Sequence, residues 1–326
     1  MAYFQVVAGL VLLVVAGDYL VRGSVSLAMR AGLSKLVIGL TIVAFGTSAP
    51  EMLVGVDAVF KGAPTLAIGN VVGSNIANAL LVVGLPAVLA PMTCSAPKIG
   101  RNLAIMLGAS VVFIALAQDG AFTWVEGLML LAFLGMFLVF SIVGRKACPV
   151  ESAAQMAEME ELDRKPDTYK VAFLCLFGGL IGLALGADML VIGSVDIARE
   201  FGISEAVIGL TLVALGTSLP ELVTGVMAAI RGHCDVAVGN VIGSNIFNLL
   251  AIMGVTSLFG TVPVPDSFLR VDLWVMLGSS LLLVPFIKLR SNVGKLSGAA
   301  MIVLYIGYMV YLAHSSESAA VMGLHV

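Results

Sequence analysis

Charged residues are scarce in this sequence. Only 11% of its 326 residues are Asp, Glu, Lys or Arg, whereas 60% are hydrophobic. A soluble domain carries about 25% charged residues, so this composition excludes an ordinary soluble protein and predicts a chain whose main partner is the lipid bilayer. The net charge is −3 and no basic patch is present, so we expect no nucleic-acid partner.

Histidine and cysteine are also rare, and this narrows the possible chemistry. The three histidines lie near the ends of apolar runs or in the tail, no HExxH motif occurs, and the four cysteines form no CxxC pair. The sequence also has no phosphate-binding loop and no cofactor motif. We therefore expect no cofactor and no enzymatic activity. A membrane hydrolase is one alternative class, although only the two glutamates described below lie beside a serine.

Long apolar runs dominate the chain, and a membrane-crossing helix needs about 20 such residues. Ten runs are long enough or nearly so: 3–21, 36–60, 65–90, 102–117, 122–143, 171–198, 206–230, 235–259, 271–289 and 297–313. The polar segment 145–170 separates the fifth run from the sixth. The sequence thus predicts an all-α integral membrane protein with two five-helix halves, 1–144 and 171–326, joined by a linker, 145–170.

The distribution of Lys and Arg predicts the orientation, because these residues are enriched in cytoplasmic loops. With the N-terminus outside, 14 of the 17 Lys and Arg residues fall on the cytoplasmic side. Only Lys61, Arg199 and Arg270 fall outside. We therefore expect both termini outside and a cytoplasmic linker.

The two halves contain an internal repeat. Residues 37–84 align without a gap to residues 207–254, with 27 identities in 48 positions. Upstream, Asp18 aligns with Asp188, and we assign these two acids a structural or gating role rather than ion binding. Five spans separate equivalent positions, so the second half enters the membrane in the opposite direction. Inverted repeats are typical of secondary transporters, whose site lies at the midplane where the repeats meet.

The first repeated motif is Gly-Thr-Ser-x-Pro-Glu, at 46–51 and again at 216–221. On a helix, Thr47, Ser48 and Glu51 share one face because they are three or four residues apart. Pro50 has no N–H, so the carbonyl of Gly46 loses its helical partner and the helix is expected to break. The equivalent residues of the second half are Thr217, Ser218 and Glu221.

The second motif is Gly-Asn-x-x-Gly-Ser-Asn-x-x-Asn, at 69–78 and 239–248. It adds one hydroxyl and one amide per half, from Ser74 and Asn78 and from Ser244 and Asn248. We interpret the other asparagines of the motif as mostly structural. Carboxylate, hydroxyl and amide oxygens are hard ligands that suit Ca²⁺ or Na⁺ rather than Zn²⁺ or copper.

These paired motifs resemble the α-repeats of the sodium/calcium exchanger family of the cation/calcium antiporter superfamily, in its prokaryotic form. The resemblance implies a 5+5 inverted fold with broken helices at the midplane, and alternating access in which Na⁺ and Ca²⁺ compete for one cluster. Carried over by motif position, the implied cation ligands are Glu51, Glu221, Thr47, Ser48, Thr217, Ser218, Ser74, Asn78, Ser244 and Asn248, with the backbone carbonyls of Ala44 and Ala214.

The resemblance therefore implies a multi-pass antiporter of a prokaryotic cell (inner) membrane that exchanges Na⁺ for Ca²⁺. Family members often have Asp at one of the positions of Asn78 and Asn248, but both are neutral here. This makes the potassium-dependent branch a poorer match. The alternatives are exchange of Ca²⁺ for H⁺ or another monovalent cation, and a cation channel, whose flux would need no counter-ion.

Overall fold

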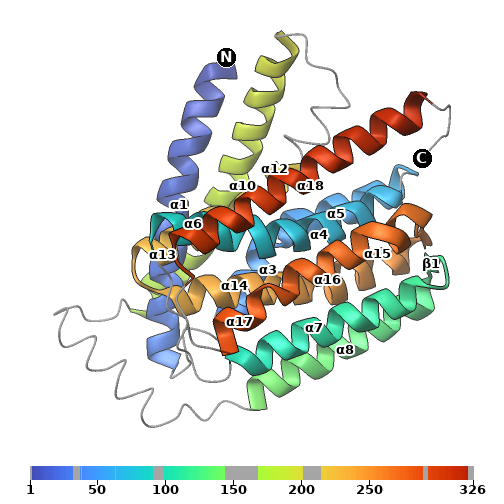
Figure 1. Cartoon of the computed structure of the whole chain (residues 1–326). Coiled ribbons are helices and arrows are strands. Elements are labelled where there is room, and N and C mark those ends of the chain that lie inside the picture. The colour runs from blue at the N-terminus through green and yellow to red at the C-terminus, as the bar shows by residue number, and fades with distance from the viewer. Residues whose placement is uncertain are drawn as a thin grey trace.

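Helices make up almost all of the computed structural model, which describes residues 2–31, 37, 39–62, 64–90, 99–143, 168–200, 214–288 and 293–321 (Figure 1). The predicted linker, 145–170, lies outside these residues except for 168–170, and so does most of the N-terminal part of the predicted span 206–230. Continuous helices are expected, because every backbone polar group must find a partner when no water is available.

The described elements follow the apolar runs. In the first half they are α1 (Ala2–Ala31), the π-helix η1 (Gly39–Val43), α3 (Ala44–Thr47), α4 (Ala49–Phe60), α5 (Thr65–Ala77), the π-helix η2 (Asn78–Val82), α6 (Val83–Leu89), α7 (Ile99–Ala117), β1 (Ala121–Phe122) and α8 (Trp124–Val143). In the second half they are α10 (Tyr169–Glu200), α12 (Ala214–Thr217), α13 (Leu219–Ile230), α14 (Cys234–Phe247), the π-helix η4 (Asn248–Ile252), α15 (Met253–Phe259), β2 (Val262–Pro263), the π-helix η5 (Phe268–Asp272), α16 (Leu273–Leu281), α17 (Leu283–Lys288) and α18 (Lys295–Val321). The two short strands pair antiparallel, with Phe122 opposite Val262.

Within the described residues, eight helices are long and apolar enough to cross a membrane. A ninth span is formed if η1–α3 and α4, which are bent by 47° at Ser48, are taken together. The fold is therefore that of a multi-pass α-helical membrane protein, as predicted. The count of ten spans is not confirmed, since the seventh predicted span is described only from Ala214 onward.

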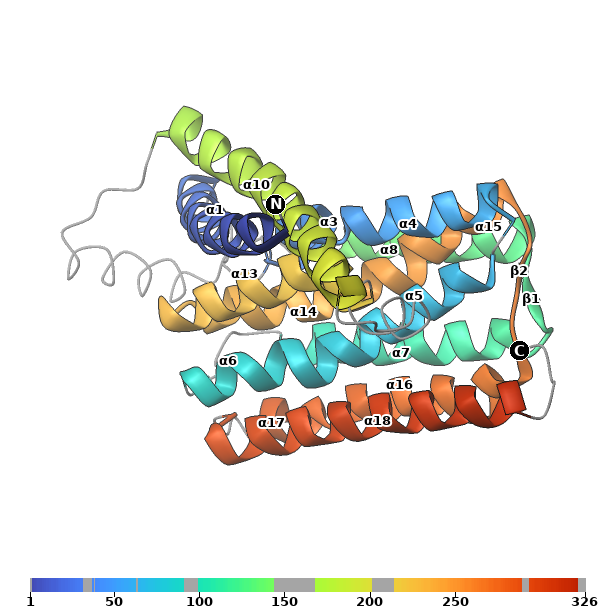
Figure 2. The same ribbon diagram turned by 90° about the horizontal axis from the view of Figure 1, so that it is seen from above.

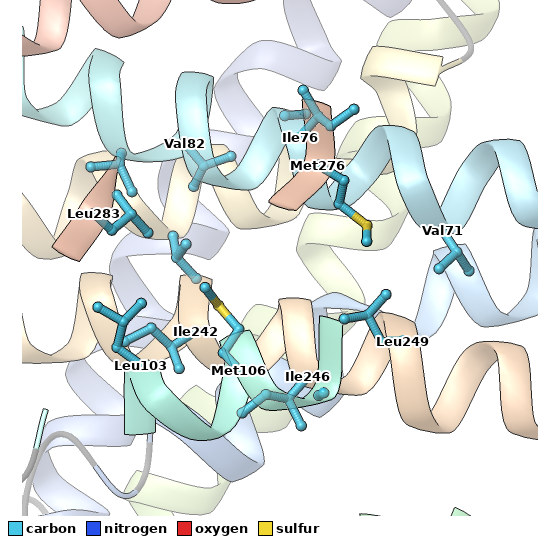
Figure 3. Close-up of a cluster of buried hydrophobic side chains, with 14 of the residues drawn as sticks. Val71, Ile76, Val82, Leu103, Met106, Ile242, Ile246, Leu249, Met276 and Leu283 are labelled. Carbon is cyan, nitrogen blue, oxygen red and sulfur yellow. The ribbon is translucent and has the colours of Figure 1, made fainter. Parts of the chain in front are cut away.

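The helices α5–η2–α6 and α14–η4–α15 form the centre of the bundle. A stretch of 18 residues in the second of these is wholly buried, and 78% of such a stretch in the first is buried, against 17–44% in the other long helices. Figure 3 shows the apolar contacts that α7 and α16 make with this centre, through Met106, Ile246, Leu249 and Met276 among others.

The helices α1 and α10 lie side by side as a separate antiparallel pair, steeply inclined to the rest of the bundle (Figures 1 and 2). In both views the pair lies toward the end of the bundle that holds α13 rather than α4. Its outer surface carries large exposed apolar side chains such as Phe4, Val11, Leu174 and Ile181, as expected of a face in contact with lipid.

Equivalent helices end in the same way in the two halves. After α4, Gly62 has φ +74°, and after α13, Gly232 has φ +73°. Each glycine N–H donates to a carbonyl three residues back, Val59 and Ala229 respectively. Glycine adopts this left-handed conformation at no steric cost, so the same residue closes both helices.

Candidate cation site

Both copies of the first motif break their helix at the serine. Ser48 has φ −85° and ψ 5°, and Ser218 has φ −88° and ψ 4°, so the two interruptions share one backbone geometry. Each break places a proline and a glutamate in the first turn of the next helix, α4 or α13. Proline is tolerated there because those N–H groups lack intrahelical acceptors, and the helix dipole favours an anion at this end. The sequence predicts that the carbonyl of Gly46 has no helical partner. In the structure this carbonyl accepts a backbone N–H at the cap of α3, so it is not free.

The two glutamates are brought together by crossed hydrogen bonds between the halves. Ser48 Oγ donates to Glu221 Oε1 at 3.0 Å, and Ser218 Oγ lies 3.5 Å from Glu51 Oε1. Glu51 is 1% exposed and Glu221 is fully buried. Each half therefore supplies the serine that holds the carboxylate of the other half.

The serines of the second motif complete this cluster. Ser244 Oγ donates to Glu221 Oε1 at 3.4 Å, and Ser218 Oγ lies 3.4 Å from Ser74 Oγ. Both Ser74 and Ser244 are buried. The two carboxylates and four serine hydroxyls of the predicted set thus form two hydrogen-bonded groups, Glu221 with Ser48 and Ser244, and Glu51 with Ser218 and Ser74.

Oxygen atoms without partners occur in matching pairs around these groups. Glu51 Oε2 and Glu221 Oε2 are buried and accept no hydrogen bond, and the same holds for Asn78 Oδ1 and Asn248 Oδ1. Leaving a buried polar atom unsatisfied costs about 1–3 kcal/mol, and more when it is charged. These atoms are where a dehydrated cation would find its ligands.

Asn78 and Asn248 each begin a π-helix, η2 and η4. Single-turn π-helices inside α-helices are frequent at functional sites, because the wider turn changes the direction of a side chain and loosens the carbonyl ladder. Asn248 Nδ2 donates to Asn75 Oδ1 at 3.3 Å, and the Oδ1 of Asn248 itself has no partner. The equivalent positions therefore share both chain geometry and an unused amide oxygen.

The remaining predicted ligands lie beside the cluster with partners of their own. Thr47 Oγ1 lies 3.3 Å from the carbonyl of Ala44 and 3.3 Å from Asn240 Oδ1. The Ala44 carbonyl also accepts the N–H of Ser48. In the second half Ala214 begins the short helix α12 and Thr217 ends it. Their roles as ligands stay predictions.

Two asparagines that we interpret from the sequence as structural, Asn75 and Asn240, contact the predicted ligands. Asn75 accepts the amide of Asn248 on its side chain and that of Asn245 on its backbone carbonyl, at 3.3 and 3.4 Å. Asn240 contacts Thr47 across the halves. The presence of both asparagines in each copy of the motif was the available signal. What it could not show is that each reaches into the opposite half.

The donor set consists of hard oxygen ligands. Among the described residues, no three His, Cys, Asp or Glu side chains lie close enough to hold one metal ion together. The available ligands are two carboxylates with neutral hydroxyl and amide oxygens, which suit Ca²⁺ or Na⁺.

Comparison with known proteins agrees with this geometry. The profile of the family described as "Sodium/calcium exchanger protein" matches residues 1–143 and 171–313. The chain is 34% identical to sodium/calcium exchanger MaX1 of Methanosarcina acetivorans, over 93% of this chain and 96% of that protein. It is 36% identical to putative antiporter CaxA of Alkalimonas amylolytica, over 95% and 98%.

A solved structure agrees as well. The sodium-calcium exchanger NCX_Mj, from a crystal soaked without Na⁺ and Ca²⁺, superposes with a TM-score of 0.82 at 34% identity, covering 95% of this chain and 98% of that one. The profile match spans both halves, and the similarity to the exchangers extends over nearly the whole chain. The chain therefore belongs to the sodium/calcium exchanger family.

Proposed function

We propose that this protein is a secondary antiporter that exchanges Na⁺ for Ca²⁺ across a membrane at one central site built by both halves. The observation that carries the proposal is the pair of crossed serine–glutamate contacts, in which each buried carboxylate keeps one oxygen without a partner. The family and the named relatives supply the identity of the ions.

The charge of the site supports exchange between these two ions. Two ionised glutamates carry −2, which balances one Ca²⁺ or two Na⁺. Ca²⁺ takes six to eight oxygen ligands, and the carboxylates with the serine, threonine and asparagine side chains offer enough. A third Na⁺ would have only neutral oxygens, because Asn78 and Asn248 carry no charge. Ions that need the same carboxylates compete, and competition at one site is the basis of antiport.

Transport requires the site to open to one side at a time. The chain divides into repeats 1–144 and 171–326, with linker 145–170 in the cytoplasm and both termini outside. This division follows from the inverted repeat, and the orientation follows from the 14 of 17 Lys and Arg residues that it places inside. The membrane is the inner membrane of a prokaryotic cell, and α1 with α10 moves against the remaining helices.

The test is ⁴⁵Ca²⁺ uptake into proteoliposomes containing the purified protein. Uptake that depends on internal Na⁺ and stops when the Na⁺ gradient is removed is the expected result. Uptake that ignores Na⁺ but follows a pH gradient would replace this proposal with Ca²⁺/H⁺ exchange. Uptake that needs no counter-ion inside the vesicles would indicate a channel.

Two variants make the test specific to the site. Glu51→Gln and Glu221→Gln should each abolish Na⁺-dependent uptake, since each removes half of the charge that holds the cation. Asp119→Asn is the matched control, because Asp119 is an exposed acid in the turn between α7 and β1. It should transport at the rate of the unmodified protein.

A further inference from the structure

The two halves carry an acid and a base at equivalent positions, and these residues can form ion pairs between the halves. Adding 170 to a position in the first half gives its counterpart, so Asp18 of α1 corresponds to Asp188 of α10, and Lys61 after α4 corresponds to Arg231 after α13. Each half thus contributes an acid on its first helix and a base at the end of its broken helix. Because the halves are inverted, the two bases lie toward opposite sides of the membrane.

Only one of the two possible pairs is formed. Arg231 forms an ion pair with Asp18 through both Nε and Nη2, 213 residues away in the chain, and both side chains are only one-third exposed. Lys61 instead pairs with Asp57 of its own helix at 2.6 Å, with side chains 72% and 57% exposed. Asp188 is exposed, and it forms no ion pair within the described part of the chain.

The packing around these residues differs in the same way. α1 packs on α13, and a Cβ added at Gly17 would lie 2.6 Å from Val223 Cγ1. The counterpart of Val223 is Leu53 on α4, which is 73% exposed. Figures 1 and 2 show the α1–α10 pair at the α13 end of the bundle, with α4 beyond it.

α1 and α10 are joined closely enough to move as one body. Glycines on both helices allow the backbones to touch: an added Cβ would lie 2.8 Å from the Gly186 carbonyl at Gly9, 2.7 Å from the Leu20 nitrogen at Gly179, and 2.7 Å from the Ala172 carbonyl at Gly23. Small residues of this kind give the tight helix contacts found in membranes. A shift that takes α1 away from α13 therefore carries α10 with it.

We propose that Asp18–Arg231 and Asp188–Lys61 are alternating ion pairs that hold the two access states of the transporter. The structure shows the first pair formed and α1 packed on α13, which is one of these two states. In the opposite state the two halves exchange their arrangements, as inverted repeats can. The α1–α10 pair then lies against α4, Lys61 leaves Asp57 for Asp188, and Asp18 separates from Arg231. This inference rests on the proposed antiport.

The expected size of the effect follows from the exposure of these residues. Partly exposed ion pairs change an equilibrium by about twofold to fivefold. That is enough to bias two access states without locking either of them. A transporter that must visit both states in each cycle needs pairs of this modest strength.

Charge reversal tests the unformed pair through transport. Lys61→Asp and Asp188→Lys alone should each slow Na⁺-dependent ⁴⁵Ca²⁺ uptake about twofold to fivefold, and the two together should restore it. The pair formed in the structure is the matched control. Asp18→Arg and Arg231→Asp alone should each slow uptake, and the two together should restore it. The mismatched combination of Asp188→Lys with Arg231→Asp should give no rescue. The proposal is overturned if Lys61→Asp combined with Asp188→Lys does not restore uptake, or if the mismatched combination restores it equally well.

A distance measurement serves as a second readout and does not depend on flux. Spin labels are attached to cysteines introduced in place of Leu53 on α4 and Ile192 on α10. The four native cysteines are changed to serine in this variant. In nanodiscs, a fraction of the molecules should show a short distance between the two labels, as expected when α10 lies against α4. This fraction should decrease in the Lys61→Gln variant and increase in the Arg231→Gln variant. A single distance that neither variant changes overturns the ion-pair proposal. If the unmodified protein shows no Na⁺-dependent uptake, it is the proposed function that fails.

Discussion

Glu51→Gln is the substitution whose effect follows most directly from the site. The side chain is 1% exposed, and one of its oxygens has no partner in the protein. Glutamine has nearly the same shape and keeps one oxygen, so the change removes a charge while preserving the packing. The site then carries −1 in place of −2.

The loss can be estimated from Coulomb's law. Two unit charges at about 4 Å interact by about 4 kcal/mol at an effective dielectric constant of about 20. Removing one carboxylate charge therefore costs about 8 kcal/mol of gross attraction for Ca²⁺ and about 4 kcal/mol for each Na⁺. If only a quarter of this survives after changes in solvation, Ca²⁺ binding weakens by about 2 kcal/mol, or roughly 30-fold, and Na⁺ binding by about fivefold.

The assay is ⁴⁵Ca²⁺ binding to purified protein by scintillation proximity, with Na⁺ as competitor. The expected result is a large loss of Ca²⁺ affinity and a smaller loss of Na⁺ affinity, and Glu221→Gln should behave the same way. Asp119→Asn controls for the removal of an acid far from the site. A Glu51→Gln protein that binds Ca²⁺ within threefold of the unmodified protein, or that loses Na⁺ more strongly than Ca²⁺, would refute the reasoning.

Three further predictions concern the pH response and the packing. Protons compete with cations for the two glutamates, so Na⁺-dependent Ca²⁺ flux should fall as the pH is lowered from about 8 to about 5, and a constant flux would contradict ionised ligands. Gly179→Ala should lower the melting temperature, with a loss of about 1–3 kcal/mol, because the new Cβ would lie 2.7 Å from the Leu20 backbone. Its neighbour Gly178 has nothing within 4 Å of an added Cβ, so Gly178→Ala should leave stability equal or higher in the same thermal assay. Asn75→Ala removes the acceptor of the Asn248 amide and should cost about 1–3 kcal/mol, whereas unchanged stability would show that this contact is dispensable.

Several features could be predicted from the sequence because they depend on local chemistry. Apolar runs gave the positions of the described helices, and Pro50 gave the break at Ser48, where the bend is 47°. The inverted repeat indicated that the two glutamates meet, and the crossed contacts with Ser48 and Ser218 place them together. Each of these depends on residues close in sequence or on one symmetry operation.

Other features depend on contacts between segments far apart, which a single sequence does not reveal. The π-helices that begin at Asn78 and Asn248 lie inside the two central helices, and no local sequence signal marks them. The contact of Asn75 with Asn248 crosses from one half to the other. Arg231 pairs with an acid of the other half, whereas Lys61 pairs with an acid of its own helix. The sequence does not predict this difference, because the two halves are similar in sequence and only the conformation decides which of them packs against α1.

The crossed contacts of the site have the pattern of a two-fold symmetric interface. When residue i of one unit touches j of another while j of the first touches i of the second, the interface is isologous, as in a two-fold dimer. Ser48 and Glu221, with Ser218 and Glu51, satisfy that rule within one polypeptide. The two halves of one polypeptide thus meet as the subunits of a symmetric dimer do, so a change to either serine alters the surroundings of the acid in the other half.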